Sequence, residues 1–211
     1  MKYKLLKRIL NNACKPKGVL GMIILKFMNG FGHRFLAEWA FEHLEIYDGA
    51  TILDIGCGGG GNIARLLKRF PNSIVDGMDY SKTSVSLSGK VNSIEITNNR
   101  CHIILGSVNK IPLCPATYDV VTAFETIYYW QDIEKSFREV YRILKDYGTF
   151  YIVNGADAEK GNLWDKYIDN MHTYSYKEIE NTLNKIGFKE IHIYREEKYP
   201  FLCISSKKVL S

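Results

Sequence analysis

The 211-residue chain is long enough for one domain with a full core and too short for two ordinary ones. Its hydrophobic content of 46% and charged content of 24% are typical of a soluble globular protein and argue against global disorder. The formal net charge of +5 is mild, and nucleic-acid binders usually concentrate basic residues in one patch, so no nucleic-acid partner is expected. We expect a single domain over residues 1–211, with a helical cap over residues 1–47 and a core over residues 48–208.

The residues before the first strand are predicted to be helical, and they begin with the basic, amphipathic run MKYKLLKRIL. Such a run is typical of a solvated helix face, and a membrane-surface or lid helix is the alternative. The apolar stretch from Val19 to Met28 contains a lysine and is too short to cross a membrane, and no convincing signal-peptide cleavage site follows it. We therefore expect a cytoplasmic protein without stable membrane insertion.

Beyond residue 50, short apolar runs alternate with amphipathic segments. Strands are predicted over residues 51–56, 73–79, 102–106, 118–124, 148–154, 189–195 and 201–207. Helices are predicted over residues 62–70, 133–144 and 176–187, and a weaker, serine-rich helix over residues 81–96. Strands separated by helices indicate a parallel sheet with helices on both faces, and the last two strands, joined without a helix, indicate an antiparallel edge. The predicted fold class is therefore α/β.

The five cysteines contain no C-x-x-C pair and none of the spacings of a zinc site. They are Cys14, Cys57, Cys101, Cys114 and Cys203. We expect reduced thiols and no metal.

The stretch ILDIGCGGGGN, from Ile52 to Asn62, joins the first predicted strand to the first helix of the core. In a parallel sheet of this kind the ligand lies beyond the carboxyl ends of the strands, so the glycine turn belongs to the site. Gly56, Gly58 and Gly61 also satisfy the dinucleotide pattern G-x-G-x-x-G, so spacing alone does not distinguish NAD from another nucleoside cofactor.

Asp54 discriminates between these cofactors. Beside a diphosphate its carboxylate would face like charge, which costs roughly 4 kcal/mol at about 4 Å in an effective dielectric near 20. Beside the ammonium and sulfonium of S-adenosylmethionine the sign is reversed. The second carboxylate, Asp79, ends the next strand, where it can accept hydrogen bonds from both ribose hydroxyls. It supports an adenosine ligand without choosing between the two cofactors.

The chain resembles the class I S-adenosylmethionine-dependent methyltransferases, in particular the small-molecule branch that includes ubiquinone and menaquinone methyltransferases. The resemblance covers roughly residues 48–207 and is carried by ILDIGCGGG, VDGMDYS, IPLCPATYDVV, FREVYRILKDYGTFYIV and YSYKEIENTLNKIGFKEIHI. It implies a Rossmann-like, doubly wound seven-stranded sheet, mostly parallel with a reversed last strand, plus N-terminal helices. It also implies S-adenosyl-L-methionine as the cofactor and S-adenosyl-L-homocysteine as its product.

The same resemblance implies the residues around the cofactor. Those matching Asp54, Gly56 and Gly58 hold the methionine end, Asp79 holds the ribose, and Tyr80 packs on adenine. The family usually has Gly-Asp-Ala where this chain has Gly106-Ser107-Val108, so the adenine contact falls to the Ser107 hydroxyl or to a water. The full expected set is Asp54, Gly56, Cys57, Gly58, Asp79, Tyr80, Ser81, Ser107, Val108 and Phe124, with Cys57 acting mainly as a spacer.

The acceptor side is expected in FETIYYWQD, after the fourth core strand. Tyr128, Tyr129 and Trp130 either form an apolar wall for the acceptor or pack the start of the next helix. The candidate catalytic residues are His33, Glu125 and Tyr129, and the candidate bases are His33, Glu125 and His172. A base is not essential, because the sulfonium is already an activated leaving group.

The function predicted from the sequence is methyl transfer from S-adenosylmethionine to a small molecule by in-line displacement, without a metal. An RNA or protein methyltransferase is the first alternative, and a cofactor-binding protein without transfer activity is the second.

Overall fold

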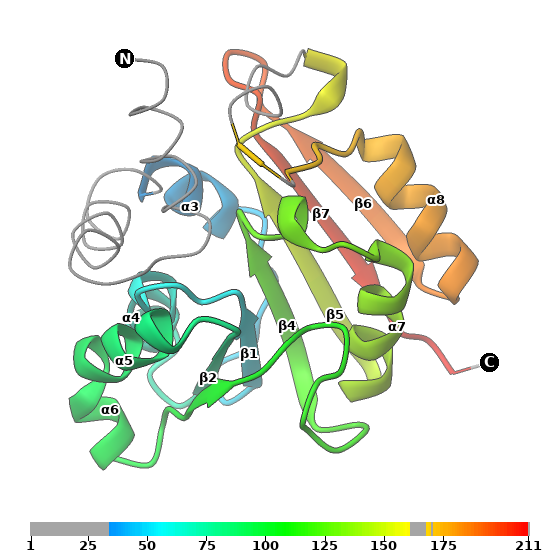
Figure 1. Ribbon diagram of the computed structural model, residues 1–211. Coiled ribbons are helices and arrows are strands. Elements are labelled where there is room, and N and C mark those ends of the chain that lie inside the picture. Colours follow the sequence, from blue (N-terminus) through cyan, green and yellow to red (C-terminus); the bar gives the residue numbers. More distant parts are fainter. Residues whose placement is uncertain (1–33, 161–167, 170, 211) are drawn as a thin grey trace, which may run out of the picture.

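A computed structural model of the chain describes residues 34–160, 168, 169 and 171–210. These residues form a seven-stranded sheet in the order β3-β2-β1-β4-β5-β7-β6, with helices on both faces (Figure 1). The α/β class and the Rossmann-like sheet expected from the sequence are confirmed.

The described helices and strands fall close to the predicted ranges. In chain order they are α3 (Arg34–Phe41), β1 (Thr51–Ile55), α4 (Gly61–Arg69), β2 (Ile74–Asp79), α5 (Lys82–Val91), α6 (Ser93–Thr97), β3 (Ile103–Leu105), β4 (Tyr118–Phe124), the 3₁₀ turn η2 (Ile127–Tyr129), α7 (Ile133–Ile143), β5 (Leu144–Asn154), the 3₁₀ turn η3 (Ala158–Lys160), α8 (Tyr176–Ile186), β6 (Lys189–Arg195) and β7 (Leu202–Lys207).

Strands β1 to β5 pair in parallel, with β1 between β2 and β4. The reversed strand is β7, which pairs antiparallel with both β5 and β6. It therefore lies one strand in from the edge, and β6 is outermost. The chain order reverses between β1 and β4, so the crevice beyond their carboxyl ends is where a ligand is expected.

Two predicted elements differ from the observed ones. The serine-rich helix divides into α5 and α6 at Asn92, whose side-chain amide donates to the carbonyl of Ser88 at 3.0 Å and to that of Gly60 at 3.2 Å. Strand β5 begins four residues before the predicted Gly148, because α7 ends at Ile143 and Leu144 at once pairs with Tyr118.

The sheet separates two apolar cores. Ile52, Val120 and Val153 face α3 and α4, whereas Leu53, Val121 and Ile152 face α7 and α8. This alternation follows the two-residue period of side chains along a strand. Asp54 and Thr122, each two residues beyond Ile52 or Val120, consequently face the α3 and α4 side.

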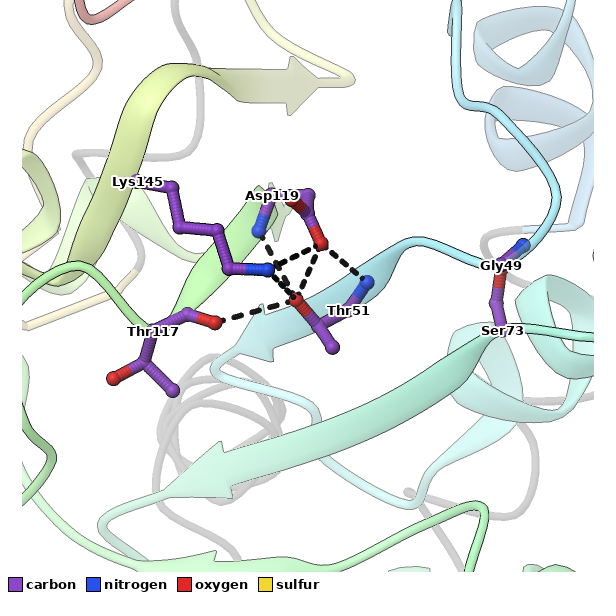
Figure 2. A network of polar contacts seen from close by, with 6 residues as sticks. All are labelled: Gly49, Thr51, Ser73, Thr117, Asp119 and Lys145. Atoms are coloured by element: carbon purple, nitrogen blue, oxygen red, sulfur yellow. Dashed lines mark hydrogen bonds and ion pairs between the residues drawn. The ribbon is translucent and has the colours of Figure 1, made fainter.

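A polar network ties the amino ends of β1, β4 and β5 together (Figure 2). The Asp119 carboxylate accepts hydrogen bonds from the Thr51 hydroxyl at 2.6 Å, the Thr51 N–H at 2.8 Å and the Lys145 ammonium at 2.9 Å. Partial burial opposes ionisation of Asp119, but these donors outweigh it and lower its pKa. The network stabilises the edge of the sheet opposite to the glycine turn.

Within the described residues, the predicted cap over residues 1–47 is represented by α3 and the segment that follows it, and residues 1–33 lie outside them. Among all the residues that the structure describes, no helix is both long and apolar enough to span a bilayer. The same residues contain no group of three or more metal-ligating side chains. The predictions of a cytoplasmic location and of a metal-independent reaction stay predictions.

Candidate cofactor and acceptor site

The glycine turn after β1 is held by contacts within the protein. Gly56 has a φ of +74°, and its N–H donates to the carbonyl of Met78 at 2.7 Å. A Cβ on Gly56 would lie 2.7 Å from Cβ of Thr126, and one on Gly60 would lie 2.9 Å from Cα of Ser88. Glycine is thus required at both positions by backbone conformation and close packing.

The buried carboxyl group of Asp54 lies at the base of this turn. Its side chain is 1% exposed, and its Oδ1 accepts a hydrogen bond from the Thr122 hydroxyl at 2.8 Å. Burial raises the pKa of Asp54 to about 7, the hydrogen bond from Thr122 opposes this shift, and the nearby charge of Asp79 adds to it. The charged form of so poorly solvated a carboxyl group is stabilised by a cationic neighbour and destabilised further by a phosphate.

Asp79, the last residue of β2, is hydrogen-bonded to the glycine turn and to the residue that precedes α5. Its Oδ2 accepts the Gly58 N–H at 3.0 Å, and its Oδ1 accepts the Ser81 N–H at 2.8 Å. Burial raises the pKa of Asp79, and these backbone donors oppose the shift. Each carboxylate oxygen has a second lone pair, so Asp79 can position the turn and still accept hydrogen bonds from a ligand.

Cys57 points away from the ligand side of the turn. Its thiol is buried, with Sγ 3.9 Å from the Ser88 hydroxyl, and packs so closely on β2 that a Cβ on Gly77 would lie 3.0 Å from it. Burial, together with the charges of Asp79 and Asp54, raises the pKa of the thiol well above its ordinary value. The buried thiol packs the turn against β2 and α5, and the predicted spacer role of Cys57 stays a prediction.

The predicted adenine residues gather at the ends of β2 and β3. Leu105 pairs with Asp79, and the next N–H, of Gly106, donates to the Asp79 carbonyl at 3.0 Å. The side chains of Tyr80 and Ser107, which follow these strand ends, are exposed. Ser81 instead caps α5 by accepting the Ser84 N–H, and Val108 packs against the core on the α7 side.

The side chain of Phe124, at the end of β4, is buried and packs edge-on against Phe41 of α3, with ring centroids 5.8 Å apart. It thereby fixes α3 on the sheet. Its predicted contact with the methionine part of the cofactor stays a prediction.

Glu125 ties the carboxyl ends of β4 and β5 together. It adopts a left-handed conformation with a φ of +56°, and its Oε1 accepts the Tyr128 hydroxyl at 3.0 Å and the N–H of Gly155. The Tyr128 oxygen in turn accepts the Ala156 N–H at 3.0 Å. These contacts give Glu125 a positioning role between the two strand ends, and its predicted role as a base stays a prediction.

The aromatic residues after β4 mainly pack the protein interior. Trp130 is 6% exposed and stacks on Phe150 at 6.4 Å, with its edge on Phe137 of α7 at 5.9 Å, while Tyr128 is 3% exposed. Trp130 therefore packs against the next helix, which was one of the two predicted alternatives. The rings of Tyr128 and Trp130 are both buried, so neither forms an open wall for the acceptor. Tyr129 is half-buried, with its hydroxyl 4.0 Å from Sδ of Met171.

Of the two histidine candidates, only His172 lies within the described residues. His172 is exposed, its ring lies 4.4 Å from that of Tyr174, and its N–H donates to the Tyr128 carbonyl at 2.9 Å. His33 lies outside the described residues, so its role stays a prediction.

Comparisons with known proteins agree with this geometry. Residues 53–152 match a family described as a methyltransferase domain. The chain is 30% identical over 102 residues to cycloartenol-C-24-methyltransferase of Arabidopsis thaliana, a match covering 48% of this chain and 30% of that protein. It is 29% identical over 179 residues to the uncharacterized methyltransferase YdaC of Bacillus subtilis, covering 82% of this chain and 91% of YdaC.

Solved structures of other methyltransferases share the fold. Geranyl diphosphate C-methyltransferase of Streptomyces coelicolor, solved with Mg²⁺, geranyl diphosphate and S-adenosyl-L-homocysteine, matches with a TM-score of 0.75 at 16% identity, covering 98% of this chain and 97% of that one. The chain is thus similar to class I S-adenosylmethionine-dependent methyltransferases in its methyltransferase domain, residues 53–152, and in its fold. It spans less than a third of the plant enzyme and nearly all of YdaC. Its place in the quinone branch of these methyltransferases stays a prediction.

The sequence did not indicate two further residues of the candidate site. Thr122 pairs with Asp54 across β1 and β4 and donates to its carboxylate. Thr126 packs against Gly56, and its hydroxyl accepts the Trp130 indole N–H at 3.3 Å. A signal was available for Thr122, because a polar residue in an otherwise apolar buried strand needs a partner on the neighbouring strand.

Proposed function

We propose that the protein transfers the methyl group of S-adenosyl-L-methionine to a small-molecule acceptor. The observation that carries this proposal is the buried carboxyl of Asp54 at the base of the glycine turn, next to Asp79. This pair suits a nucleoside bearing positive charge and opposes a diphosphate. In the proposed complex Asp54 favours the cationic methionine end, Asp79 accepts from the ribose hydroxyls, and Tyr80 and Ser107 contact adenine.

The bound cofactor supplies an electrophilic methyl group on a sulfonium. An electron pair of the acceptor would form the new bond to the methyl carbon as the carbon–sulfur bond breaks, S-adenosyl-L-homocysteine would leave, and a proton of the acceptor would pass to solvent. The chain's own contribution is to align the acceptor and exclude water. Glu125 holds the loops after β4 and β5 for that purpose, and contact of His33 and Tyr129 with the acceptor remains part of the proposal.

A small acceptor is supported by the relatives whose names state a substrate. The Arabidopsis enzyme is named for cycloartenol, and the Streptomyces structure contains geranyl diphosphate. Both are small molecules with large apolar parts. The mild net charge of this chain also does not favour nucleic acid.

Two measurements test the function. Calorimetric titration with S-adenosylmethionine, S-adenosylhomocysteine and NAD should show binding of the first two only, and tight NAD binding alone would overturn the cofactor assignment. Tritiated cofactor is then offered to small thiols, amines, phenols and quinols, to total RNA and to total protein. Label is expected in small molecules. Label only in RNA or protein would favour the first alternative, and cofactor binding without any transfer would favour a non-catalytic protein.

We propose further that residues 1–47 cap the site. The described part of this segment, α3, is packed on Phe124 at the end of β4, which supports the idea. A variant lacking residues 1–30 should keep its affinity for S-adenosylhomocysteine and lose acceptor turnover. Equal turnover by the two proteins would contradict a cap.

A further inference from the structure

Four aromatic side chains cluster where α3 meets the turn between β6 and β7. We call Phe35, Trp39, Tyr199 and Phe201 the aromatic cluster. The Phe35 ring lies edge-on to Tyr199 at 5.3 Å and to Phe201 at 5.7 Å, and Phe201 lies 5.7 Å from Trp39. Tyr199 and Phe201 stack at 5.2 Å. The cluster joins two segments more than 150 positions apart in the chain.

The aromatic cluster lies at the reactive edge of the sheet. Phe201 immediately precedes Leu202, which pairs with Asn154, the last residue of β5. The carboxyl ends of β4 and β5 and the start of β7 therefore share one edge, which is the edge of the glycine turn. Figure 1 shows α3 and the turn from β6 to β7 toward the end of the sheet at which the β4 arrow points.

Within the aromatic cluster, Phe35 offers the most ring surface. It is 61% exposed, whereas Trp39, Tyr199 and Phe201 are half-buried. One face of Tyr199 stacks on Phe201, and the Lys198 ammonium lies 5.4 Å from the Tyr199 ring centre. Beside β4 and β5, the exposed aromatic surface of this edge thus comes from α3 and the β6–β7 turn and not from the buried Tyr128 and Trp130, while Tyr80 is exposed at the end of β2.

The position of the Phe35 ring is set by the core. Leu36, Ala37, Ala40 and Phe41 of α3 are buried, and Phe41 packs on Phe124, whose backbone leads directly into Glu125. Because α3 is anchored on the last residue of β4, Phe35 belongs to an element that is fixed relative to that strand end. Such fixed placement is what an in-line displacement requires.

We propose that the aromatic cluster binds the methyl acceptor, and that the acceptor carries a flat apolar ring that packs on Phe35. The proposal rests on the proposed function and names its substrate class. Ring pairs gain from offset-stacked or edge-to-face contact in addition to burial of apolar surface, so the cluster selects a ring over an alkyl chain of similar polarity. The acceptor's heteroatom attacks the methyl carbon and its proton passes to solvent, so no further reactant is needed.

The test compares Phe35→Ala and Phe35→Leu with Ile94→Ala, a control that truncates a 74% exposed apolar side chain on α6. Transfer of tritiated methyl is measured to 1-naphthol, 2-naphthylamine and thiophenol, and to butanol, butylamine and butanethiol. The wild type should prefer the ring compounds. Phe35→Ala should raise KM for them by about tenfold or more with little change in kcat, Phe35→Leu should lie between, and Ile94→Ala should match the wild type.

Equilibrium dialysis of 1-naphthol against protein loaded with S-adenosylhomocysteine gives a readout that does not need turnover. Saturable binding by the wild type that weakens about tenfold in Phe35→Ala supports the proposal, provided that both proteins bind S-adenosylhomocysteine equally. Absence of naphthol binding by the wild type, an unchanged KM in Phe35→Ala, or equal use of rings and alkyl chains would overturn it. Failure of the proposed function itself would appear separately, as loss of methyl transfer to every small molecule tested.

Discussion

The carboxylate of Asp54 and the hydroxyl of Thr122 are 2.8 Å apart on neighbouring strands, and both side chains are buried at the base of the glycine turn. Thr122 keeps Asp54 oriented and satisfies one of its oxygens. The remaining free-energy cost of burying the charged Asp54 carboxylate is offset when a cation is bound nearby. Two predictions follow from this pair.

The affinity for S-adenosylmethionine should increase with pH through neutrality. The pKa of Asp54 is about 7 in the cofactor-free protein, so its carboxyl becomes charged as the pH rises past that value. The charged form attracts the sulfonium, and binding should release a proton on the acid side of pH 7. Calorimetry at about pH 6, 7 and 8 in buffers of different ionisation enthalpy measures both effects. Because Asp54→Asn lacks the titrating carboxyl, its pH profile shows how much the cofactor's own ionisation contributes. An identical pH profile in wild type and variant would contradict the role given to Asp54.

The same substitution should stabilise the cofactor-free protein at alkaline pH. The pKa of Asp54 is raised above the ordinary value of 3.8 for an aspartate, so its favourable contribution to stability is complete below about pH 4 and is lost as the pH rises through about 7. Asp54→Asn removes this loss. At pH 8 the free energy of unfolding of the variant should therefore exceed that of the wild type by at least about 1 kcal/mol. Urea unfolding at pH 4 and pH 8 tests the sign, because the advantage must disappear at pH 4.

Asp79→Ala should weaken S-adenosylhomocysteine binding by at least about tenfold. It removes a charged acceptor for ribose and frees the N–H groups of Gly58 and Ser81, and hydrogen bonds to charged groups are worth about 1.5 to 3 kcal/mol each. Asp76→Ala is the matched control. Asp76 lies on the same strand and bonds to the Tyr118 hydroxyl at 2.8 Å in the α7-side core. It should lower stability and leave affinity unchanged. Equal affinity losses in the two variants would mean that Asp79 acts only through the fold.

Gly56→Ala should destabilise the protein by about 1 to 3 kcal/mol, because it combines a φ of +74° with a collision against Thr126. Adding Thr126→Gly should recover the part due to the collision and leave the part due to the backbone. Gly89→Ala, in helix α5 with open space around the new methyl group, should instead stabilise by about 0.5 to 1 kcal/mol. Thermal unfolding of the four proteins separates these terms, and a tolerated Gly56→Ala would show that the turn is looser than described.

Asp119→Ala should lower stability by about 1 to 3 kcal/mol without changing cofactor affinity. It leaves the Thr51 N–H and the Lys145 ammonium without their shared acceptor (Figure 2). The affected edge of the sheet is opposite to the glycine turn, because Thr51 begins β1 and the turn follows the end of that strand. Lys145→Ala removes only a half-exposed partner and should cost less, about 0 to 1 kcal/mol. Denaturant unfolding and calorimetry on both variants test this. A loss of affinity in Asp119→Ala that exceeds its effect on folding would show coupling between the two edges.

The sequence by itself determined the sheet and the cofactor end of the site. Strands and helices have different apolar periods, so their alternation was visible, and the carboxyl ends of parallel strands always meet at one edge. Asp54, the glycine turn and Asp79 could therefore be placed together before any coordinates were known. Their local contacts, such as Asp79 with Ser81, span only a few residues and follow from the turn itself.

Only the tertiary structure decided the partners of these residues and the arrangement of the acceptor side. Thr122 reaches Asp54 across 68 positions, and Phe35 meets Tyr199 across more than 160. Glu125, a candidate base by sequence, is engaged by Tyr128 and Gly155 because β5 returns beside β4. Which side chains share a space after strands pair and helices pack depends on register and crossing geometry. Neither is encoded in the local period of the chain.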